Sequence, residues 1–584
     1  MIKEEKEQTK YLLTFKTIRT MKMRKFFALV LTGALFAACS TDDMVEVDNG
    51  VITTGEKDAW VYLNIVTANG SMTRNLNGIQ NGTDKESKVT DVMAIFFDGH
   101  VDDHGTNASA ANPNVVNVGT MILGTPGQPS GAQGAAFEIS KDAKSILVIV
   151  NPTAKFKAQI NSKTKFAEIN AAIAEDIADV AKDDNFMMTN AKGALEPSDA
   201  DGVGETLKTY PTAGAAEGAP LTIKVDRVAA KIRVYNDATG QPTEQYPLTV
   251  SDFGWVENAT NKKYFPISQR IATWNEDPGN TGDGALGTFR APYDQYKIGS
   301  YRVDPNYLAG KNSNAFTTAA YTDEYNAIAD GGAITDATWS NGGNAGTWRG
   351  SATSAYCLEN TQVAEKNSHA WTTHVIVKAK VYPKTIPSGP TTQNSSDGDY
   401  TSDAQLDGTQ DLIAYGSGIY TYETYLNFVY EELVGYFMSP AESSYSTPFT
   451  DALNAFLAGN AVTITGTRGD TQPGAMVTAK GFKSTFEGKT LAAGTVGTFK
   501  YYAVSTSYYK IMIKHDDTAA AMNALGEFGV VRNSVYDVRI GSISNLGYPE
   551  IPGPDETKDE EDKAWLSVKI DINPWTWYTQ TEHL

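Results

Sequence analysis

Residue types that commonly carry chemistry are present in this chain, but they are not spaced as a catalytic or metal site requires. The sequence contains no HExxH pair, no GxSxG nucleophile elbow and no GxxxxGKS/T phosphate loop. Acidic stretches at 199–202 and 397–399 resemble fragments of calcium loops, but neither reaches the terminal Glu, and ordinary turn chemistry explains both. The spacing therefore disfavours an enzyme and predicts no cofactor and no metal. The histidines considered are His100, His104, His369, His374, His515 and His583.

Cys39 is the one residue in a context typical of covalent modification. It follows Ala37 and Ala38, an apolar stretch at 26–36 and a basic stretch at 22–25, which is the order of an export signal. The apolar stretch is too short to span a bilayer as a stable helix. Small residues directly before a Cys resemble a bacterial lipobox, in which the thiol is acylated, for example with palmitate. We expect Cys39 to be lipidated; the alternative is a chance apolar stretch that contains a buried Cys.

The C-terminal segment has a strand pattern with one apolar face. An acidic stretch at 555–563 precedes this strand and holds no residue able to anchor it in a core. A strand on a flexible tether usually binds in a groove by adding to the edge of a sheet, and that groove can belong to another molecule. The alternatives are a tail that folds back as the last strand of its own chain, and a terminal Trp that serves as a ligand platform. The residues concerned are Leu566, Val568, Ile570, Ile572 and Trp575.

Length and composition limit the class of protein. At 584 residues the chain is too long for one ordinary core, so two to four domains are expected. The 51 Gly, 29 Tyr and charged fraction of 20% favour β-sandwiches with many turns over helical bundles. A formal net charge of −20 argues against nucleic acid or an anionic membrane surface as partner. If Cys39 carries lipid, Cys357 is the only other thiol, so no internal disulfide is expected.

Hydrophobic periodicity predicts strands, two helices and three long insertions. A helix is predicted at 165–180, whose apolar stripe is interpreted as core rather than as a binding face, and a shorter one runs from Thr450 to Gly459. Strands are predicted at 60–66, 89–98, 146–151, 221–235, 247–256, 372–382, 462–467, 501–514 and 530–543. Surface loops are predicted at 275–286, 333–353 and 388–408. Tyr501, Tyr502, Tyr508 and Tyr509 fit cross-strand packing better than sugar stacking.

Several short segments, taken together and in order, are similar to one known family. They are residues 60–74, KVTDV at 88–92, IVN at 149–151, VDRVAAKI at 225–232, VSDFGW at 250–255, KKY at 262–264, YCLENT at 356–361, VRNSVY at 531–536 and the terminal 568–575. Each is weak alone, but together they cover nearly the whole chain. The chain resembles the fimbrillin family of type V pili, and within it the major shaft-forming subunit of the short, or minor, fimbriae.

The resemblance implies a fold, a route of export and a set of partners. The implied fold is mainly β, with two transthyretin-like β-sandwich domains, a few short helices and a C-terminal donor strand. The implied precursor is an outer-membrane lipoprotein held by its lipid anchor, and an arginine-specific protease removes its first strand. The mature subunits then form an extracellular fimbrium by strand exchange with identical subunits and with accessory, tip and anchor subunits. No nucleic acid is involved.

The residues and the resemblance together divide the chain into segments. Residues 1–20 are interpreted as an over-extended start, 21–39 as a lipoprotein signal peptide with its lipobox, 40–74 as a propeptide containing the first strand, 75–235 as an N-terminal β-sandwich domain, 236–550 as a C-terminal β-sandwich domain, and 551–584 as the acidic tether and donor strand.

The residues support strand exchange independently of the resemblance. Val61, Leu63 and Ile65 alternate with more polar residues, so the first strand has an apolar face able to fill a groove. The turn-rich segment after it contains a lone basic residue, Arg74. Cleavage between Arg74 and Asn75 would free the first strand and leave an open, apolar edge, which the C-terminal strand of another subunit could refill. The alternative is that Arg74 is only a solvated loop residue.

Two rival functions share some of these features. A surface glycan-binding lipoprotein would have the same export signal, acidity and β-rich composition, but it would need neither a removable first strand nor a tethered last one. A tip or accessory fimbrial subunit is closer. A tip subunit, however, has nothing beyond it to receive a donor strand.

Overall fold

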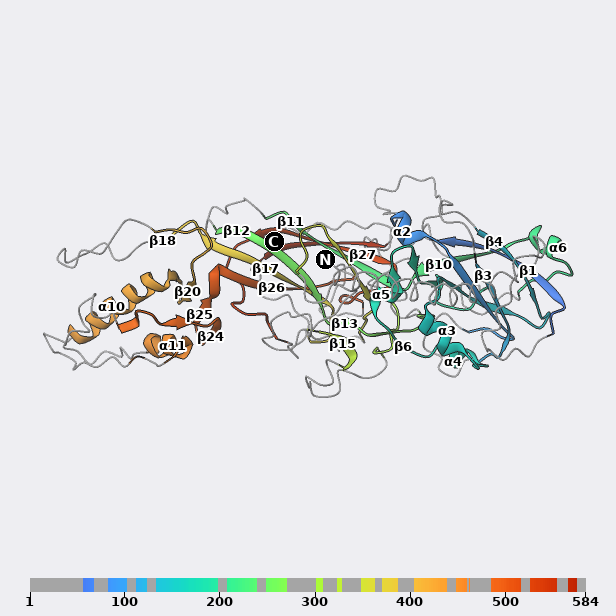
Figure 1. Cartoon of the computed structure of the whole chain (residues 1–584), viewed down its shortest axis with the longest axis horizontal. Helices are drawn as coiled ribbons and strands as arrows, with labels where there is room; N and C mark the ends of the chain where they lie inside the picture. Colours follow the sequence, from blue (N-terminus) through green and yellow to red (C-terminus); the bar gives the residue numbers. More distant parts are fainter. Residues whose placement is uncertain are drawn as a thin grey trace, which may run out of the picture. The chain divides into compact units, whose positions relative to one another are not determined.

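The protein is described here by a computed structural model. It describes residues 56–67, 82–101, 112–122, 133–197, 207–238, 248–269, 301–307, 323–327, 348–362, 370–386, 404–438, 448–459, 462, 485–515, 526–553 and 566–574. Its fold is mainly β, with several separate sheets and a few mostly short helices, which confirms the predicted class (Figure 1). The predicted insertions lie outside the described residues, except for 348–353 and 404–408.

A seven-stranded sheet contains the first strand of the chain. Its order is β3 (Val115–Ile122), β2 (Asp91–Phe97), β5 (Ser145–Val150), β9 (Met188–Asn190), β10 (Leu221–Arg227), β1 (Ala59–Thr67) and β4 (Gln133–Ile139). After their first residues, Asp91 and Ser145, β2 and β5 are apolar runs that are buried along their length, so both of their faces are covered. The pairing of β1 with β10 is parallel, and the other pairings in this sheet are antiparallel.

The two edge strands of this sheet approach each other. A Cβ added to Gly119 of β3 would lie 2.5 Å from Cδ1 of Phe137 on β4. The Phe137 ring also packs against Phe96 of β2, with ring centroids 6.0 Å apart. The sheet is therefore curled around its own apolar side chains, and Gly119 leaves the space that Phe137 occupies.

Short helices cover part of this sheet, and they correct the prediction of one helix at 165–180. They are α3 (Ala154–Ile160), α4 (Phe166–Ile169), α5 (Ile177–Val180) and α6 (Ala213–Glu217). Between α4 and α5, β6 (Ile173–Ala174) pairs with β14 (Lys263–Tyr264). The Asp176 side chain accepts a hydrogen bond from the Ala178 amide at 2.9 Å and starts α5 as a separate helix. The predicted apolar stripe is nevertheless buried in one core cluster, as expected of core residues.

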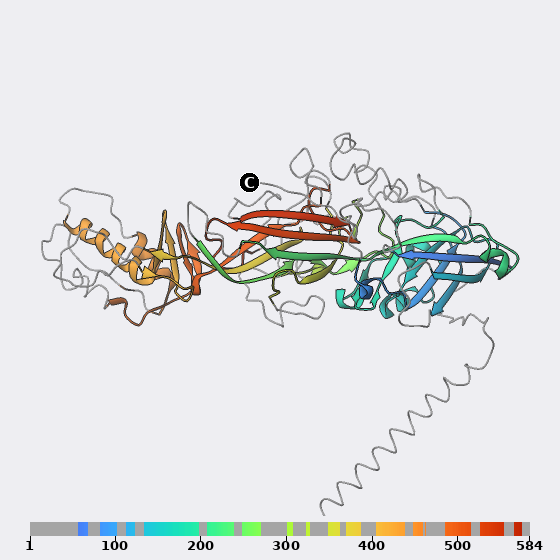
Figure 2. The same ribbon diagram turned by 90° about the horizontal axis from the view of Figure 1, so that it is seen from above.

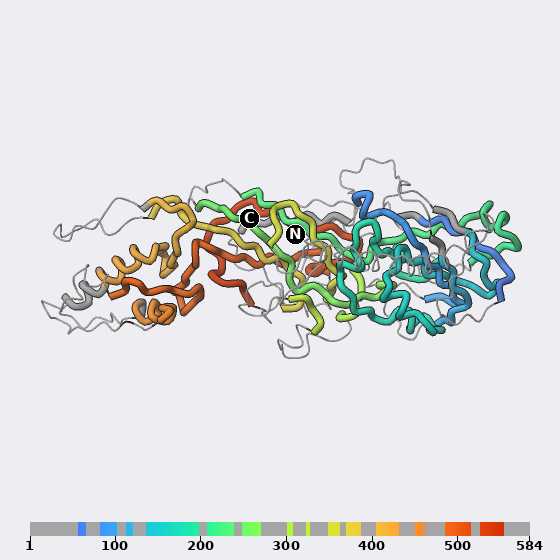
Figure 3. Tube along the Cα trace, in the orientation of Figure 1, coloured from blue at the N-terminus to red at the C-terminus, as the bar shows by residue number. Residues whose placement is uncertain are grey.

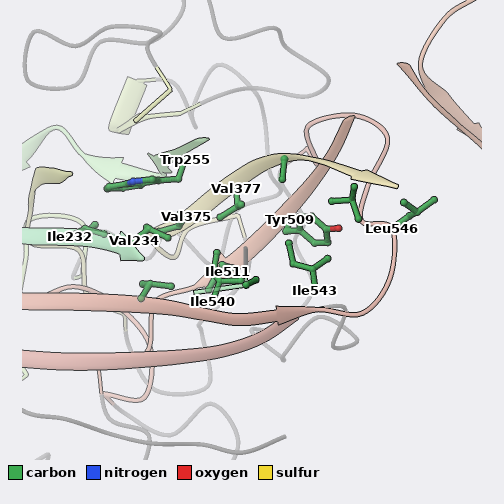
Figure 4. Packing of buried hydrophobic residues seen from close by; sticks show 14 of the residues in the cluster. Ile232, Val234, Trp255, Val375, Val377, Tyr509, Ile511, Ile540, Ile543 and Leu546 are labelled. Carbon is green, nitrogen blue, oxygen red and sulfur yellow. The ribbon is translucent and has the colours of Figure 1, made fainter. Parts of the chain in front are cut away.

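A second group of strands forms a sandwich of two sheets. The six-stranded sheet has the order β15 (Tyr325–Asn326), β13 (Thr260–Asn261), β16 (Ser354–Leu358), β11 (Ala229–Asn236), β27 (Ser534–Ile543) and β28 (Leu566–Pro574). The three-stranded sheet has the order β12 (Leu248–Asn258), β17 (His374–Pro383) and β26 (Thr506–Met512). Figure 4 shows side chains of β11 and β27 meeting those of β12, β17 and β26 in one core. Figure 3 shows β11 beside β27, although they are far apart in the sequence.

The chain passes from the first sheet to the second almost without a loop. β10 ends at Arg227 and β11 begins at Ala229, so the strand predicted at 221–235 is two strands in different sheets. A domain boundary at 235/236 would fall at the end of the first strand of the six-stranded sheet. The domain limits stay a prediction.

A four-stranded sheet has two helices beside it, which are the longest in the described ranges (Figure 1). Its order is β21 (Gly418–Thr421), β20 (Leu412–Tyr415), β25 (Phe499–Tyr502) and β24 (Gly494–Val496), and the helices are α10 (Tyr422–Met438) and α11 (Pro448–Phe456). α11 is the helix predicted from Thr450 and begins two residues earlier. Three two-stranded pairs complete the strands: β7 (Ala181–Lys182) with β8 (Asn185–Phe186), β18 (Thr385–Ile386) with β19 (Ala404–Gln405), and β22 (Leu457–Ala458) with β23 (Thr490–Leu491).

The strand predicted at 501–514 is broken by a 3-10 turn, η5 (Ala503–Ser505). Val504 and Ser505 there have φ values of +50° and +55°, which a regular strand does not allow. Tyr501, Tyr502 and Tyr509 are at most 2% exposed, so their predicted role in packing is confirmed. Within the described ranges no helix is long and apolar enough to cross a membrane, and no group of His, Cys, Asp and Glu is placed to hold a metal.

Candidate functional site

The first strand, β1, is inserted between two neighbours. Leu63–Thr67 pair in parallel with Leu221–Val225 of β10, and Ala59–Ile65 pair antiparallel with Gln133–Ile139 of β4. At its start, the Trp60 amide donates to the Tyr210 carbonyl at 2.7 Å, and the Tyr210 amide donates back at 2.8 Å. Both edges of β1 therefore carry backbone hydrogen bonds.

The side chains of β1 alternate between the core and a half-buried face. Val61, Leu63 and Ile65 are 1%, 0% and 1% exposed, whereas Tyr62 and Asn64 are only half-buried. These three residues are the ones predicted to form the apolar face of the displaced strand. The structure places them in the core; their displacement stays a prediction.

The neighbours of β1 would form an apolar groove if β1 were absent. Val61 lies opposite Phe137, and Ala59 lies opposite Ile139, both on β4 and both 1% exposed. On the other side, Ile65 lies beside Ile223 of β10, which is fully buried. Loss of β1 would therefore leave two unpaired strand edges and an apolar floor between them.

A charged pair fixes the beginning of β1. The Asp58 carboxylate accepts a hydrogen bond from the Lys141 amide at 2.7 Å and lies 2.9 Å from Lys141 Nζ. The hydrogen bond from the Lys141 amide lowers the pKa of Asp58 most, and the hydrogen bond from the Lys141 side chain lowers it further, so this pKa lies below its ordinary value. This pair is exposed, so we expect it to align β1 with the end of β4 rather than to contribute much stability.

The C-terminal strand, β28, lies on β27 in the single chain (Figure 2). It occupies the end of the six-stranded sheet and pairs antiparallel with β27, so here it is not detached from the rest of the chain. The alternating residues Leu566, Val568, Ile570 and Ile572 are in register with Ile543, Ile540, Val538 and Tyr536 of β27. Those four partners belong to the buried core of the sandwich.

β27 is also held by contacts that do not involve β28. Arg233 of β11 donates two hydrogen bonds to the carboxylate of Asp537, at 2.6 and 2.7 Å. The Tyr536 hydroxyl accepts a hydrogen bond from the Val531 amide at 2.9 Å and lies 2.7 Å from Nδ1 of His515. Because β11 also pairs with β27 along its length, departure of β28 would expose an edge without removing the support of β27.

Of the other residues singled out from the sequence, Cys357 is described and is not part of this site. Cys39, Arg74, Asn75 and Trp575 lie outside the described residues. Cys357 is a free, fully buried thiol on β16, and burial raises its pKa well above the ordinary value. Sequence reasoning predicted the residues of β10 but missed two other neighbours of β1: β4 had no predicted strand, and Tyr210 gives no strand signal.

Replacing Leu63 by Ala tests whether β1 is part of the native core of the uncut chain. We expect the uncut chain to lose about 2–5 kcal/mol of unfolding free energy, because Leu63 is fully buried. Asn64→Ala, on the half-buried face, is the matched control and should cost much less. Chemical denaturation of the uncut chains measures this; a loss for Leu63→Ala no larger than that for Asn64→Ala would contradict it.

The C-terminal region of the chain matches a known protein family. Residues 500–581 match the family model described as "Major fimbrial subunit protein type IV, Fimbrillin, C-terminal". This range contains β26, β27 and β28. No curated protein matches the chain.

The solved structures to which the chain is similar are distant in sequence. A fimbrilin from Porphyromonas gingivalis W83 is 13% identical, with 90% of this chain and 99% of that chain covered and a TM-score of 0.36. A cell adhesion candidate from Parabacteroides distasonis is 11% identical, covering 90% and 99%, with a TM-score of 0.37. A C-terminally truncated tip fimbrial protein from Porphyromonas gingivalis is 11% identical, covering 88% and 100%, with a TM-score of 0.29.

The sequence match covers the C-terminal region, which includes both strands of the β27–β28 pair. It agrees with the resemblance that the order of short segments predicts. Residues 500–581 are thus similar to the C-terminal part of the fimbrillins.

Proposed function

We propose that this chain is a structural subunit of a cell-surface fimbrial shaft that supports adhesion and polymerises by strand exchange. It is exported as a lipoprotein and cleaved after Arg74, which removes β1. β28 of a neighbouring subunit then enters the groove between β10 and β4. The observation that carries the proposal is the position of β1: it is the first described strand, it is bonded on both edges, and it supplies a fully buried apolar row.

The energetics support a long-lived contact between subunits. Four aliphatic side chains of β28, at roughly 1.5–3 kcal/mol each, contribute on the order of 6–12 kcal/mol. Ladder hydrogen bonds add roughly 0.5–1.5 kcal/mol each. Ordering the acidic segment and releasing β28 from β27 oppose this gain. The exchange is favourable in this account because the cut acceptor has two open edges to fill, whereas the donor gives up only one.

Electron microscopy of cells with and without the protein tests the proposed function. We expect the short surface fibres to disappear without it and antibody against it to decorate the whole length of each fibre. Label confined to fibre ends would favour a tip or accessory subunit. Unchanged fibres with label dispersed over the surface would favour a glycan-binding lipoprotein.

Cys39→Ser is expected to abolish lipidation and delivery to the outer membrane. The thiol is the acylated atom in this account, and a serine hydroxyl cannot replace it in the lipoprotein pathway. Metabolic labelling with a fatty-acid analogue, followed by membrane fractionation, measures both effects. Cys357→Ser, at a buried position far along the chain, is the control for loss of a cysteine as such. Equal labelling of Cys39→Ser and wild type would refute the lipoprotein route.

A further inference from the structure

The first described element after β1 is a short helix, α2 (Asp84–Ser87), whose last two residues are buried. Its Glu86 is fully buried, and one carboxylate oxygen accepts a hydrogen bond from the Thr83 amide at 2.7 Å. The Lys88 carbonyl accepts a hydrogen bond from the Asn151 side chain at 2.7 Å. The predicted cleavage site at Arg74 thus lies between β1 and an element that is anchored at both ends.

Glu86 joins α2 to the six-stranded sheet. Lys231 of β11 donates to the Glu86 carboxylate at 2.8 Å, and the Tyr356 hydroxyl of β16 donates to the same oxygen at 2.5 Å. Burial opposes ionisation of Glu86, but the charge of Lys231 and these hydrogen bonds outweigh it and hold the pKa of Glu86 below its ordinary value. Glu86 is therefore an anion with defined partners, in a place where an unpaired charge would be strongly unfavourable.

Arg227 joins the same helix to the seven-stranded sheet. It is the last residue of β10 and is fully buried. Its Nε donates to the Glu86 carbonyl at 2.8 Å, and its Nη2 donates to the Ser87 hydroxyl at 2.9 Å. α2 therefore contacts both sheets at the point where the chain passes from one to the other.

We propose that α2, through Glu86 and Arg227, is a clamp that keeps the two sheets joined after β1 has been removed. β10 pairs with β1 along Leu221–Val225, and the cut deletes that partner. Arg227, two residues further on, stays bound to α2. Any loss of order in β10 therefore does not extend into β11. The groove opens, and the sandwich that carries the donor strand keeps its structure.

This inference rests on the proposed removal of β1, and it predicts an effect that depends on the cut. While β1 is present, its backbone pairings with β4 and β10 hold these two strands together. The contacts of α2 then contribute less to keeping β10 in place. After the cut, the contacts of α2 at Arg227 hold the end of β10. An ordinary stabilising ion pair would act equally in both forms.

Hydrogen exchange of full chains with a site-specific protease sequence placed in 68–81 tests the clamp. Each variant is measured uncut, and again after cutting and removal of the released peptide. We expect Glu86→Gln to speed exchange of the β10 and β11 amides at least about tenfold in the cut form, the equivalent of one hydrogen bond to a charged group, and much less in the uncut form. Tyr356→Phe, which removes one hydrogen bond to Glu86, keeps the test valid if Glu86→Gln fails to fold.

Lys85→Ala is the matched control. Lys85 is on the same helix and lies 2.8 Å from Asp183, but both side chains are 62% exposed, so no change is expected. Equal acceleration in cut and uncut chains, or none in the cut form, would overturn the clamp. Because the cut is made in vitro, this result does not depend on natural processing. Mature fibres that begin upstream of Asn75 would refute the proposed maturation but not the clamp.

Discussion

Cut subunits that lack residues 564–584 are expected to form no fibres. The deletion removes β28 and with it the donor strand, while the groove between β10 and β4 is unchanged. Such a chain can accept a strand but cannot give one. Mixed with full-length cut subunits, it should therefore shorten fibres at a small molar fraction, because each truncated chain ends the fibre that it joins. Fibre length by electron microscopy measures this effect.

A disulfide between β27 and β28 should also stop fibre elongation, and this block should be reversible. Val538 lies opposite Ile570, and Arg539 lies opposite Lys569. Close and wide pairs alternate along an antiparallel ladder, so cysteines at one of these two neighbouring pairs have the separation that a disulfide needs. We expect oxidation to hold β28 in its own chain and stop elongation, and reduction to restore it. Elongation at the wild-type rate by locked or truncated chains would show that β28 is not the donor.

Arg74→Ala is expected to abolish fibre formation by the opposite route. The precursor should be exported and lipidated but should keep β1, so its groove stays filled by Val61, Leu63 and Ile65. N-terminal sequencing of wild-type fibres should find Asn75 as the first residue, and the variant should accumulate as an uncut monomer.

Arg74→Lys is the matched control for the type of protease. It keeps the positive charge and the length of the side chain. An arginine-specific enzyme should leave it uncut, whereas a general trypsin-like enzyme should process it normally. Wild-type fibres that begin near Ser40, or Arg74→Ala fibres of normal length, would contradict maturation at this residue.

The two terminal strands could be predicted from sequence because their patterns are local. Alternation at Val61, Leu63 and Ile65 gives a strand with one buried face in any fold that covers it. The run from Leu566 to Ile572 is equally plain. Which strands lie beside them depends on pairings distant in sequence, such as β1 with β10, and a single sequence contains no signal for such a pairing.

The mistaken elements also have physical causes. The stripe at 165–180 has helical spacing, but β6 pairs with β14 there, and Asp176 starts a new helix, so tertiary pairing overrides the local period. β10 and β11 read as one strand because only Val228 separates them. α10 was missed because its aromatic residues favour strands as strongly as helices.

The clamp at α2 gives no recognisable sequence signal. Glu86 and Lys231 are 145 residues apart, and each reads as an ordinary surface charge. Arg227 is the last residue of β10, and a charged residue is common at the end of a strand, so it does not indicate a buried contact. Only the fold shows that all three are buried together.

Crosslinking between two different subunits tests the central claim, that β28 of one chain takes the place of β1 in the next. One chain carries Ala136→Cys on β4, opposite Tyr62 of β1, and a second, tagged chain carries a cysteine at Ser567, Lys569 or Asp571 of β28. We predict that at least one pair gives a mixed disulfide-linked dimer on a denaturing gel, and only after β1 has been cut from the acceptor and removed. Fibres that form without any such crosslink, or crosslinks that are equally strong with uncut acceptors, would contradict strand exchange at this groove.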